Sequence, residues 1–145
     1  MKTLSDHILD IVQNSVNAKA TLIKIRIEKD KINNLCTLEI LDNGFGMDEQ
    51  TLAQASNPFF TTRTTRKVGL GLALLQQNAE RANGNFILNS QVNKGTQVKA
   101  TFQLSNVDRP EIGDVWDTFY LTMLSNLKID FALEFKTEKG RFEIL

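Results

Sequence analysis

The stretch "DIVQNSVNAKATLIKIRI", from Asp10 to Ile27, decides the fold, because a helical pattern gives way there to a strand pattern. Apolar and small side chains recur at helical spacing on the first part, which predicts a helix with one apolar face: Leu4, Ile8, Ile11, Val12 and Ser15. From Leu22 onward apolar and polar residues alternate, as they do in a half-buried strand. A helix followed directly by a strand favours an α/β fold.

The rest of the chain repeats these two patterns in an order that defines the fold class. The first helix is expected to begin near Thr3 or Ser5, either of which can serve as its N-cap. Further elements are predicted as a strand over 35–44, a short helix over 47–55, a helix over 70–83, a hairpin over 85–104, a helix over 114–127 and two strands within 128–145. This order predicts an α/β layered fold with a mixed sheet.

Length and composition restrict the class of protein. The chain has 145 residues, 41% hydrophobic and 23% charged, which is ordinary for one globular domain. Lys plus Arg and Asp plus Glu are both 17, so neither a general nucleic-acid surface nor an anionic-membrane surface is indicated. The single cysteine, Cys36, excludes an internal disulfide. With no signal-peptide core and no apolar run near roughly 18 residues, we expect a cytoplasmic protein.

Asp10 and Asn14 form the first pair of residues with a chemical use. They are four residues apart, so they share one face of the predicted helix. A carboxylate beside a neutral amide suits a site where Mg²⁺ needs an oxygen ligand and a water molecule needs a base. The alternative is a polar helix face in solvent, which these two residues alone do not exclude.

The segment "LDNGFGM" places Asp42 at the end of an apolar strand. A carboxylate at this position can accept a hydrogen bond from an exocyclic amine such as that of adenine. Gly44 and Gly46 would let a flat ring approach the backbone, and Met47 could supply an apolar wall. A plain connection between strand and helix would use the same Asn-Gly turn, so this alternative stays open.

The segment "NPFFTTRTTRKVGLGLAL", residues 57–74, predicts an anion site. Gly69-Leu70-Gly71 immediately before a helix would expose backbone amides where the helix dipole favours negative charge. Arg63, Arg66 and Lys67 add positive charge upstream. Gly95 and Thr96 open a later strand, and alone they indicate an ordinary hairpin turn. The sequence contains no Walker-type P-loop, so a nucleotide would have to be bound by another design.

In order and spacing these features resemble the N, G1, F, G2 and G3 boxes of the GHKL superfamily of ATPases and kinases. The corresponding segments are "DIVQNSVNA", "DNGFG", "PFFTTR", "GLGLAL" and "GT", and the match covers about residues 4–104. The resemblance is greatest to the ATPase domain of histidine kinases, with the anti-sigma-factor serine kinases next. It implies a Bergerat fold, a two-layer α/β sandwich with a mixed, mostly antiparallel sheet, helices on one face and a mobile ATP lid. It also divides the chain into an ATP-binding domain over 1–106 and an extension over 107–145 packed on the same domain.

The resemblance also implies roles for individual residues. Asn14 would be the Mg²⁺ ligand, with Asn17 and Ala18 nearby, and Asp42 would accept the adenine amine. The residues it places around ATP are Asn14, Asn17, Ala18, Asp42, Gly44, Gly46, Met47, Phe60, Thr62, Arg63, Lys67, Gly69, Leu70, Gly71, Leu72 and Thr96, with Phe59 and Phe60 anchoring the lid. Asp10 would be the catalytic residue. It stands where hydrolysing relatives usually carry Glu, and the shorter side chain puts fast hydrolysis in doubt.

Two functions follow as expectations. The first is an ATP- and Mg²⁺-binding protein kinase that transfers the γ-phosphoryl group to a partner protein, of the histidine-kinase or anti-sigma type. The chain's single histidine, His7, is expected to pack within its helix or contact solvent rather than accept the phosphoryl group. The second is an ATP-gated regulator, anti-sigma-like or associated with a redox enzyme, that binds a partner with little turnover. Neither function involves nucleic acid or a membrane, and homodimer formation is left open.

Overall fold

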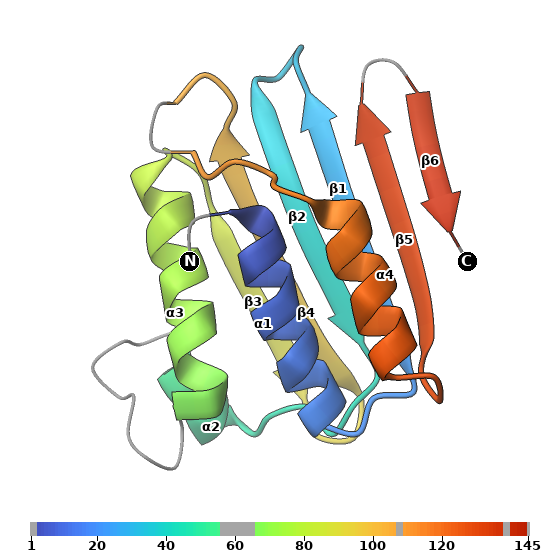
Figure 1. The fold of residues 1–145 in the computed structure, drawn as a ribbon. Helices are drawn as coiled ribbons and strands as arrows, with labels where there is room; N and C mark the ends of the chain where they lie inside the picture. Colours follow the sequence, from blue (N-terminus) through green and yellow to red (C-terminus); the bar gives the residue numbers. More distant parts are fainter. Residues whose placement is uncertain (1–2, 56–65, 107–108, 138–139, 145) are drawn as a thin grey trace.

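The computed structural model describes residues 3–55, 66–106, 109–137 and 140–144. In these residues the elements follow in the order α1 (Leu4–Asn17), β1 (Leu22–Asp30), β2 (Leu35–Asp42), α2 (Glu49–Ala55), α3 (Arg66–Arg81), β3 (Phe86–Gln91), β4 (Gly95–Gln103), α4 (Val115–Ser125), β5 (Asp130–Thr137) and β6 (Gly140–Ile144). The strands form one sheet with the order β3-β4-β2-β1-β5-β6, and the helices cover one face of it (Figure 1).

The sheet is mixed, because β1 pairs in parallel with β5 while every other neighbouring pair in the described residues is antiparallel. A parallel pair needs a crossover connection, which here includes α2, α3, the β3–β4 hairpin and α4. The predicted fold class, a two-layer α/β sandwich with a mostly antiparallel sheet and helices on one face, is confirmed. Residues of the C-terminal extension supply α4, β5 and β6, and β5 extends the same sheet (Figure 1).

The first helix, α1, begins at the predicted cap and buries the predicted apolar face. Thr3 is the N-cap: its hydroxyl accepts from the Asp6 amide, and the Asp6 carboxylate accepts from the Thr3 amide in return. The predicted apolar face is buried, with each member at most 3% exposed: Leu4, Ile8, Ile11, Val12 and Ser15. It packs against inward-facing side chains of β1 and β2 such as Ile25 and Ile40, so α1 is held firmly over the middle of the sheet.

His7 is fully buried on α1, as expected of a packing residue. Its Nε2 lies 2.8 Å from the Asn78 amide nitrogen of α3, so the side chain joins the two helices. Burial lowers the pKa of His7 from 6.5 to about 4, because desolvation penalises the imidazolium ion. The imidazole is therefore neutral in the folded protein at pH 7.

Two sequence expectations about helix ends are wrong. The helix predicted to begin at Leu70 begins at Arg66, so the glycine step lies inside it rather than before it. The last helix ends at Ser125, and Leu127, expected on its apolar face, is 80% exposed beyond that end. Both differences concern helix termini, where propensity carries least information. In the described part of the chain, none of the helices has the length and apolar content that crossing a membrane would need.

Candidate functional site

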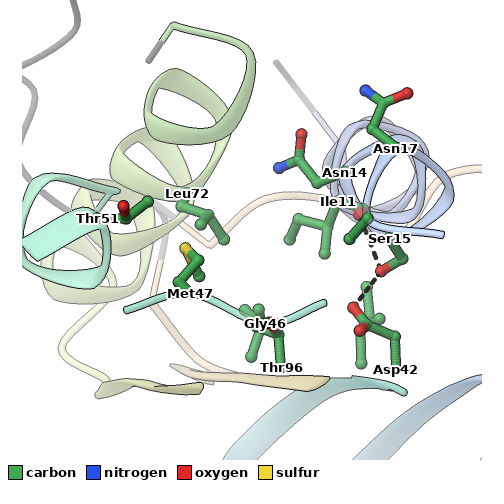
Figure 2. A pocket seen from close by; sticks show the side chains of 13 residues that line it. Ile11, Asn14, Ser15, Asn17, Asp42, Gly46, Met47, Thr51, Leu72 and Thr96 are labelled. Carbon is green, nitrogen blue, oxygen red and sulfur yellow. Dashed lines mark hydrogen bonds between the residues drawn. The ribbon is translucent and has the colours of Figure 1, made fainter. Parts of the chain in front are cut away.

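A cavity of about 220 Å³ lies between the helices and the sheet, below α1 and beside α2 and α3. Figure 2 shows its side chains converging from α1, from the ends of β2 and β4, and from the segment after β2. The described residues that line it are Ile11, Asn14, Ser15, Asn17, Ala18, Ile40, Asp42, Gly46, Met47, Thr51, Leu72, Thr96 and Val98. Most of this surface is apolar, with polar groups at a few positions, as in sites for small molecules.

Asp42 supplies the carboxylate at the floor of the cavity. It is the last residue of β2, and two protein groups hold it. The Ser15 hydroxyl donates to Oδ2 at 2.6 Å (Figure 2), and the Gly44 amide donates to Oδ1 at 2.9 Å. Each carboxylate oxygen keeps a further lone pair for a ligand. Asp42 is also the register partner of Thr96 on β4, so the two side chains lie side by side on the floor.

The glycines after β2 are needed first for contacts between chain segments. A Cβ on Gly44 would lie 2.7 Å from the Ala18 carbonyl oxygen, and one on Gly46, where φ is +70°, would lie 1.9 Å from the Gln91 carbonyl oxygen. The segment is pinned to α1 by a 2.8 Å hydrogen bond from the Phe45 amide to the Ala18 carbonyl. Gly46 and Met47 line the cavity, whereas Gly44 does not line it and its amide donates to Asp42.

Thr96 belongs to a hydroxyl pair at the β3–β4 end of the cavity. Its Oγ1 lies 2.8 Å from the Ser90 hydroxyl of β3, which also accepts from the Met47 amide at 2.7 Å. Ser90 contacts the Gly95 carbonyl oxygen at 3.0 Å as well. One serine therefore joins the cavity wall at Met47 to the cavity floor at Thr96.

Two of the predicted residues on α1 line the cavity, and a third does not. Asn14 lines it, and its Nδ2 is buried without a hydrogen-bond partner among the described residues. Asn17 lies at the rim, where its amide oxygen accepts from Gln13 at 3.3 Å, and Figure 2 shows it pointing away from Asp42. Asp10 is not on the cavity lining, although its Oδ2 is likewise buried and unpartnered in the described residues. Burial raises the pKa of Asp10 above its usual value, since the charged form loses hydration.

The phosphate-binding part of the prediction is only partly visible. Phe59, Phe60, Thr62 and Arg63, the aromatic anchor and the flap, lie outside the described residues. Lys67, Gly69, Leu70 and Gly71 belong to the first turns of α3, and Leu72 lines the cavity. Amides past the first four residues of a helix are bonded internally, so the Gly71 amide is not the free donor that was expected. The amides that have no partner within this helix belong to its first turn, which begins at Arg66.

Several residues of the site were missed by sequence reasoning. Ser15 was assigned to the apolar helix face, yet its hydroxyl orients Asp42. Ser90 was assigned only to a strand, and Thr51 of α2 only to a helix. Ile11 was predicted only on the apolar helix face, and Ile40 and Val98 only within strands, yet all three belong to the core and form an apolar wall of the cavity. A serine on an otherwise apolar helix face was the one available signal, because a buried hydroxyl needs a partner.

The chain is similar to known proteins over the part that forms the cavity. A family model described as histidine kinase-, DNA gyrase B- and HSP90-like ATPase matches residues 2–106. The putative sensor protein of Shewanella frigidimarina is 37% identical over 103 residues, which cover 70% of this chain and 16% of that protein. The sensor histidine kinase YvrG of Bacillus subtilis is 35% identical over 91 residues, covering 60% and 15% respectively. The sensor protein DegM of a Bacillus species is 31% identical over 91 residues, covering 63% and 24%. The chain thus spans at most 24% of the length of these three relatives.

Proposed function

Since the chain belongs to the family of histidine kinase-, DNA gyrase B- and HSP90-like ATPases, we propose that it transfers the γ-phosphoryl group of ATP to a partner protein. The family match makes residues 2–106 an ATP-binding, histidine-kinase-like domain. The observation that carries the proposal is the Asp42 carboxylate, oriented by Ser15 and Gly44 at the floor of an apolar cavity. We propose that the phosphoryl group is accepted by a His, Ser or Thr side chain of the partner protein.

The base of ATP is proposed to lie on Asp42 and Thr96. An oriented carboxylate accepts a hydrogen bond from the exocyclic amine of adenine, while the apolar wall, including Met47 and Leu72, contacts the ring faces. The phosphates would then extend past Asn14 toward the start of α3. The backbone amides at the N-terminus of α3, where the helix dipole favours negative charge, would supply positive potential there.

Mg²⁺ is proposed as the metal, with Asn14 as its ligand from the protein. The Nδ2 of Asn14 has no hydrogen-bond partner among the described residues, and the amide oxygen of this side chain together with phosphate oxygens and water is a donor set that suits Mg²⁺. The described residues contain no group of three or more His, Cys, Asp or Glu that could hold a metal by itself. Phosphate oxygens and water are proposed as the other ligands. When bound, the ion would neutralise charge on the phosphates during transfer.

The proposed phosphoryl transfer is tested with labelled ATP. The protein is incubated with γ-labelled ATP and Mg²⁺, alone and with candidate partners, and both phosphoprotein and free phosphate are measured. Label on a partner supports the kinase, whereas free phosphate alone supports an ATPase. ATP affinity is measured in parallel for Asp42→Asn and Asn14→Ala. Unchanged affinity in both variants would mean that the cavity is not the ATP site.

A second function is favoured by the position of Asp10 and by the surface of α4. Asp10, which the motif resemblance places where hydrolysing relatives usually carry Glu, does not line the cavity formed by the described residues, and this favours little turnover. On the outer side of α4 the side chains of Tyr120 and Leu121 are 56% and 62% exposed, and Leu9 of α1 is 54% exposed. Exposed apolar side chains of this kind favour contact with another protein. In the labelling experiment, an ATP-gated regulator would bind the nucleotide but would form no phosphoprotein and release no free phosphate.

A further inference from the structure

The Ser90 hydroxyl has three hydrogen-bond partners. The Met47 amide nitrogen lies 2.7 Å from its Oγ, the Gly95 carbonyl oxygen 3.0 Å and the Thr96 Oγ1 2.8 Å. A serine hydroxyl has one proton to donate and two lone pairs with which to accept. Three partners therefore use its full hydrogen-bonding capacity.

The chemistry of these partners determines where each proton goes. A carbonyl oxygen can only accept and an amide N–H can only donate, so Ser90 gives its one proton to Gly95 and accepts from Met47. The contact to Thr96 is then satisfied only if Thr96 donates its own proton to Ser90. The Thr96 oxygen is left with lone pairs, and without a proton, for the cavity that it lines.

Asp42, beside Thr96, is likewise a hydrogen-bond acceptor with no proton to donate. Its carboxylate accepts from Ser15 and from the Gly44 amide and has no proton to give when ionised. Asp42 and Thr96 are direct register partners on β2 and β4, and Figure 2 shows both at the floor of the cavity. The two side chains therefore present a pair of neighbouring acceptors to whatever lies on them.

We propose that Ser90 is a specificity-determining positioning residue, which makes the Asp42–Thr96 pair accept only and so selects a purine with an amino group at position 6. The proposal rests on the proposed binding of ATP with its base against Asp42. The 6-amino group of adenine carries two N–H donors and can serve both acceptors. The 6-carbonyl oxygen of hypoxanthine or guanine would face two acceptors with no proton between them, and unpaired buried polar groups are costly.

The test measures the Kd of ATP and of ITP, whose base is hypoxanthine, by calorimetry. In Ser90→Ala the Thr96 proton is free to turn toward the hypoxanthine oxygen, so the ratio of Kd for ITP to Kd for ATP should fall about fivefold, the effect of one hydrogen bond. Ser90→Thr keeps the hydroxyl and should keep the wild-type ratio. A general loosening of the site would weaken both nucleotides and leave the ratio unchanged.

The matched control is Thr101→Val, in the same hairpin. The Thr101 hydroxyl accepts from the Asn85 amide at 2.8 Å and does not line the cavity. Its loss should weaken the hairpin without changing the nucleotide ratio. A ratio that fell as far in this control as in Ser90→Ala would overturn the proposal.

Thr96→Val tests the same proton assignment without changing Ser90, and it decides the matter if Ser90→Ala fails to fold. Removal of an acceptor should weaken ATP binding and relieve the repulsion of ITP, so the ratio should fall. If Thr96 were a donor instead, the ratio would rise, and the proposal would be wrong. Should Asp42→Asn weaken ATP while the ratio stays at its wild-type value in Ser90→Ala and Thr96→Val, the inference about Ser90 fails and the proposed ATP site stands.

Discussion

His7 provides a measurable link between pH and the stability of this fold. Its side chain is 0% exposed, and its ring nitrogen contacts Asn78 on the neighbouring helix at 2.8 Å. Desolvation lowers its pKa from 6.5 to about 4, so the folded state resists protonation while the unfolded chain does not. Between these two pH values the unfolded state binds more protons, and stability must fall as pH falls.

The size of the effect follows from the shift. One pKa unit corresponds to about 1.4 kcal/mol, so the full shift amounts to about 3 kcal/mol in the free energy of unfolding. This contribution is fully present above pH 6.5 and is lost as the pH approaches 4. For His7→Gln, which removes the titrating group and keeps an acceptor for Asn78, we expect a loss between pH 7.5 and 4.5 that is smaller than in wild type by about 2 kcal/mol. Urea unfolding of both proteins at both pH values measures the difference. The titration of carboxylates over this pH range changes the stability of both proteins equally, so it cancels in the comparison.

A direct measurement supports the comparison. The chain has one histidine, so its imidazole signals in an NMR titration belong to His7 without further assignment. We expect a midpoint near pH 4. A midpoint at or above 6.5, or equal losses of stability in wild type and His7→Gln, would refute the reasoning, because the helix interface would then be accessible to water.

Four further predictions concern single residues. Thr3→Ala should lower the free energy of unfolding by about 1 kcal/mol and Thr3→Ser should not, since only the cap hydroxyl is lost. Gly95→Ala should destabilise the protein by about 3 kcal/mol or more in thermal unfolding, because φ is +114° and the new Cβ would lie 1.9 Å from a carbonyl oxygen. The control is Gly140→Ala, which should cost clearly less, because this glycine also has a positive φ but its Cβ would have nothing within 4 Å. Cys36, buried and with a pKa raised by burial, should react with a thiol reagent only after unfolding, and fast labelling of the native protein would contradict this. Asp10→Asn should raise the melting temperature at pH 7, since it removes a partly buried carboxylate with a raised pKa, and should abolish any phosphate release; a lower melting temperature would argue that Asp10 is paired.

The helices and strands of this protein could largely be predicted because they depend on local pattern. The apolar face of α1 and the alternation in β1 are visible in a few neighbouring residues, and burial follows once each element forms. The sequence predicts the start of α3 at Leu70, four residues after its actual start at Arg66, because Gly69 and Gly71 weaken the helical pattern there. Glycine lowers helix propensity by only about 1 kcal/mol, which a helix packed on α1 and α2 can offset.

By itself the sequence determined the α/β class and, through its ordered motifs, the family, and it predicted the acidic, amide and threonine side chains that line the cavity. Only the tertiary structure decided how they meet. Ser15 reaches Asp42 across 27 positions and the Met47 amide reaches Ser90 across 43, through the docking of α1 and the register of β2, β4 and β3. Local pattern carries no information on such distances, because a hydrogen bond between distant segments depends on how whole elements pack. The same packing left Asp10 off the cavity and Asn14 on it, although the two share one helix.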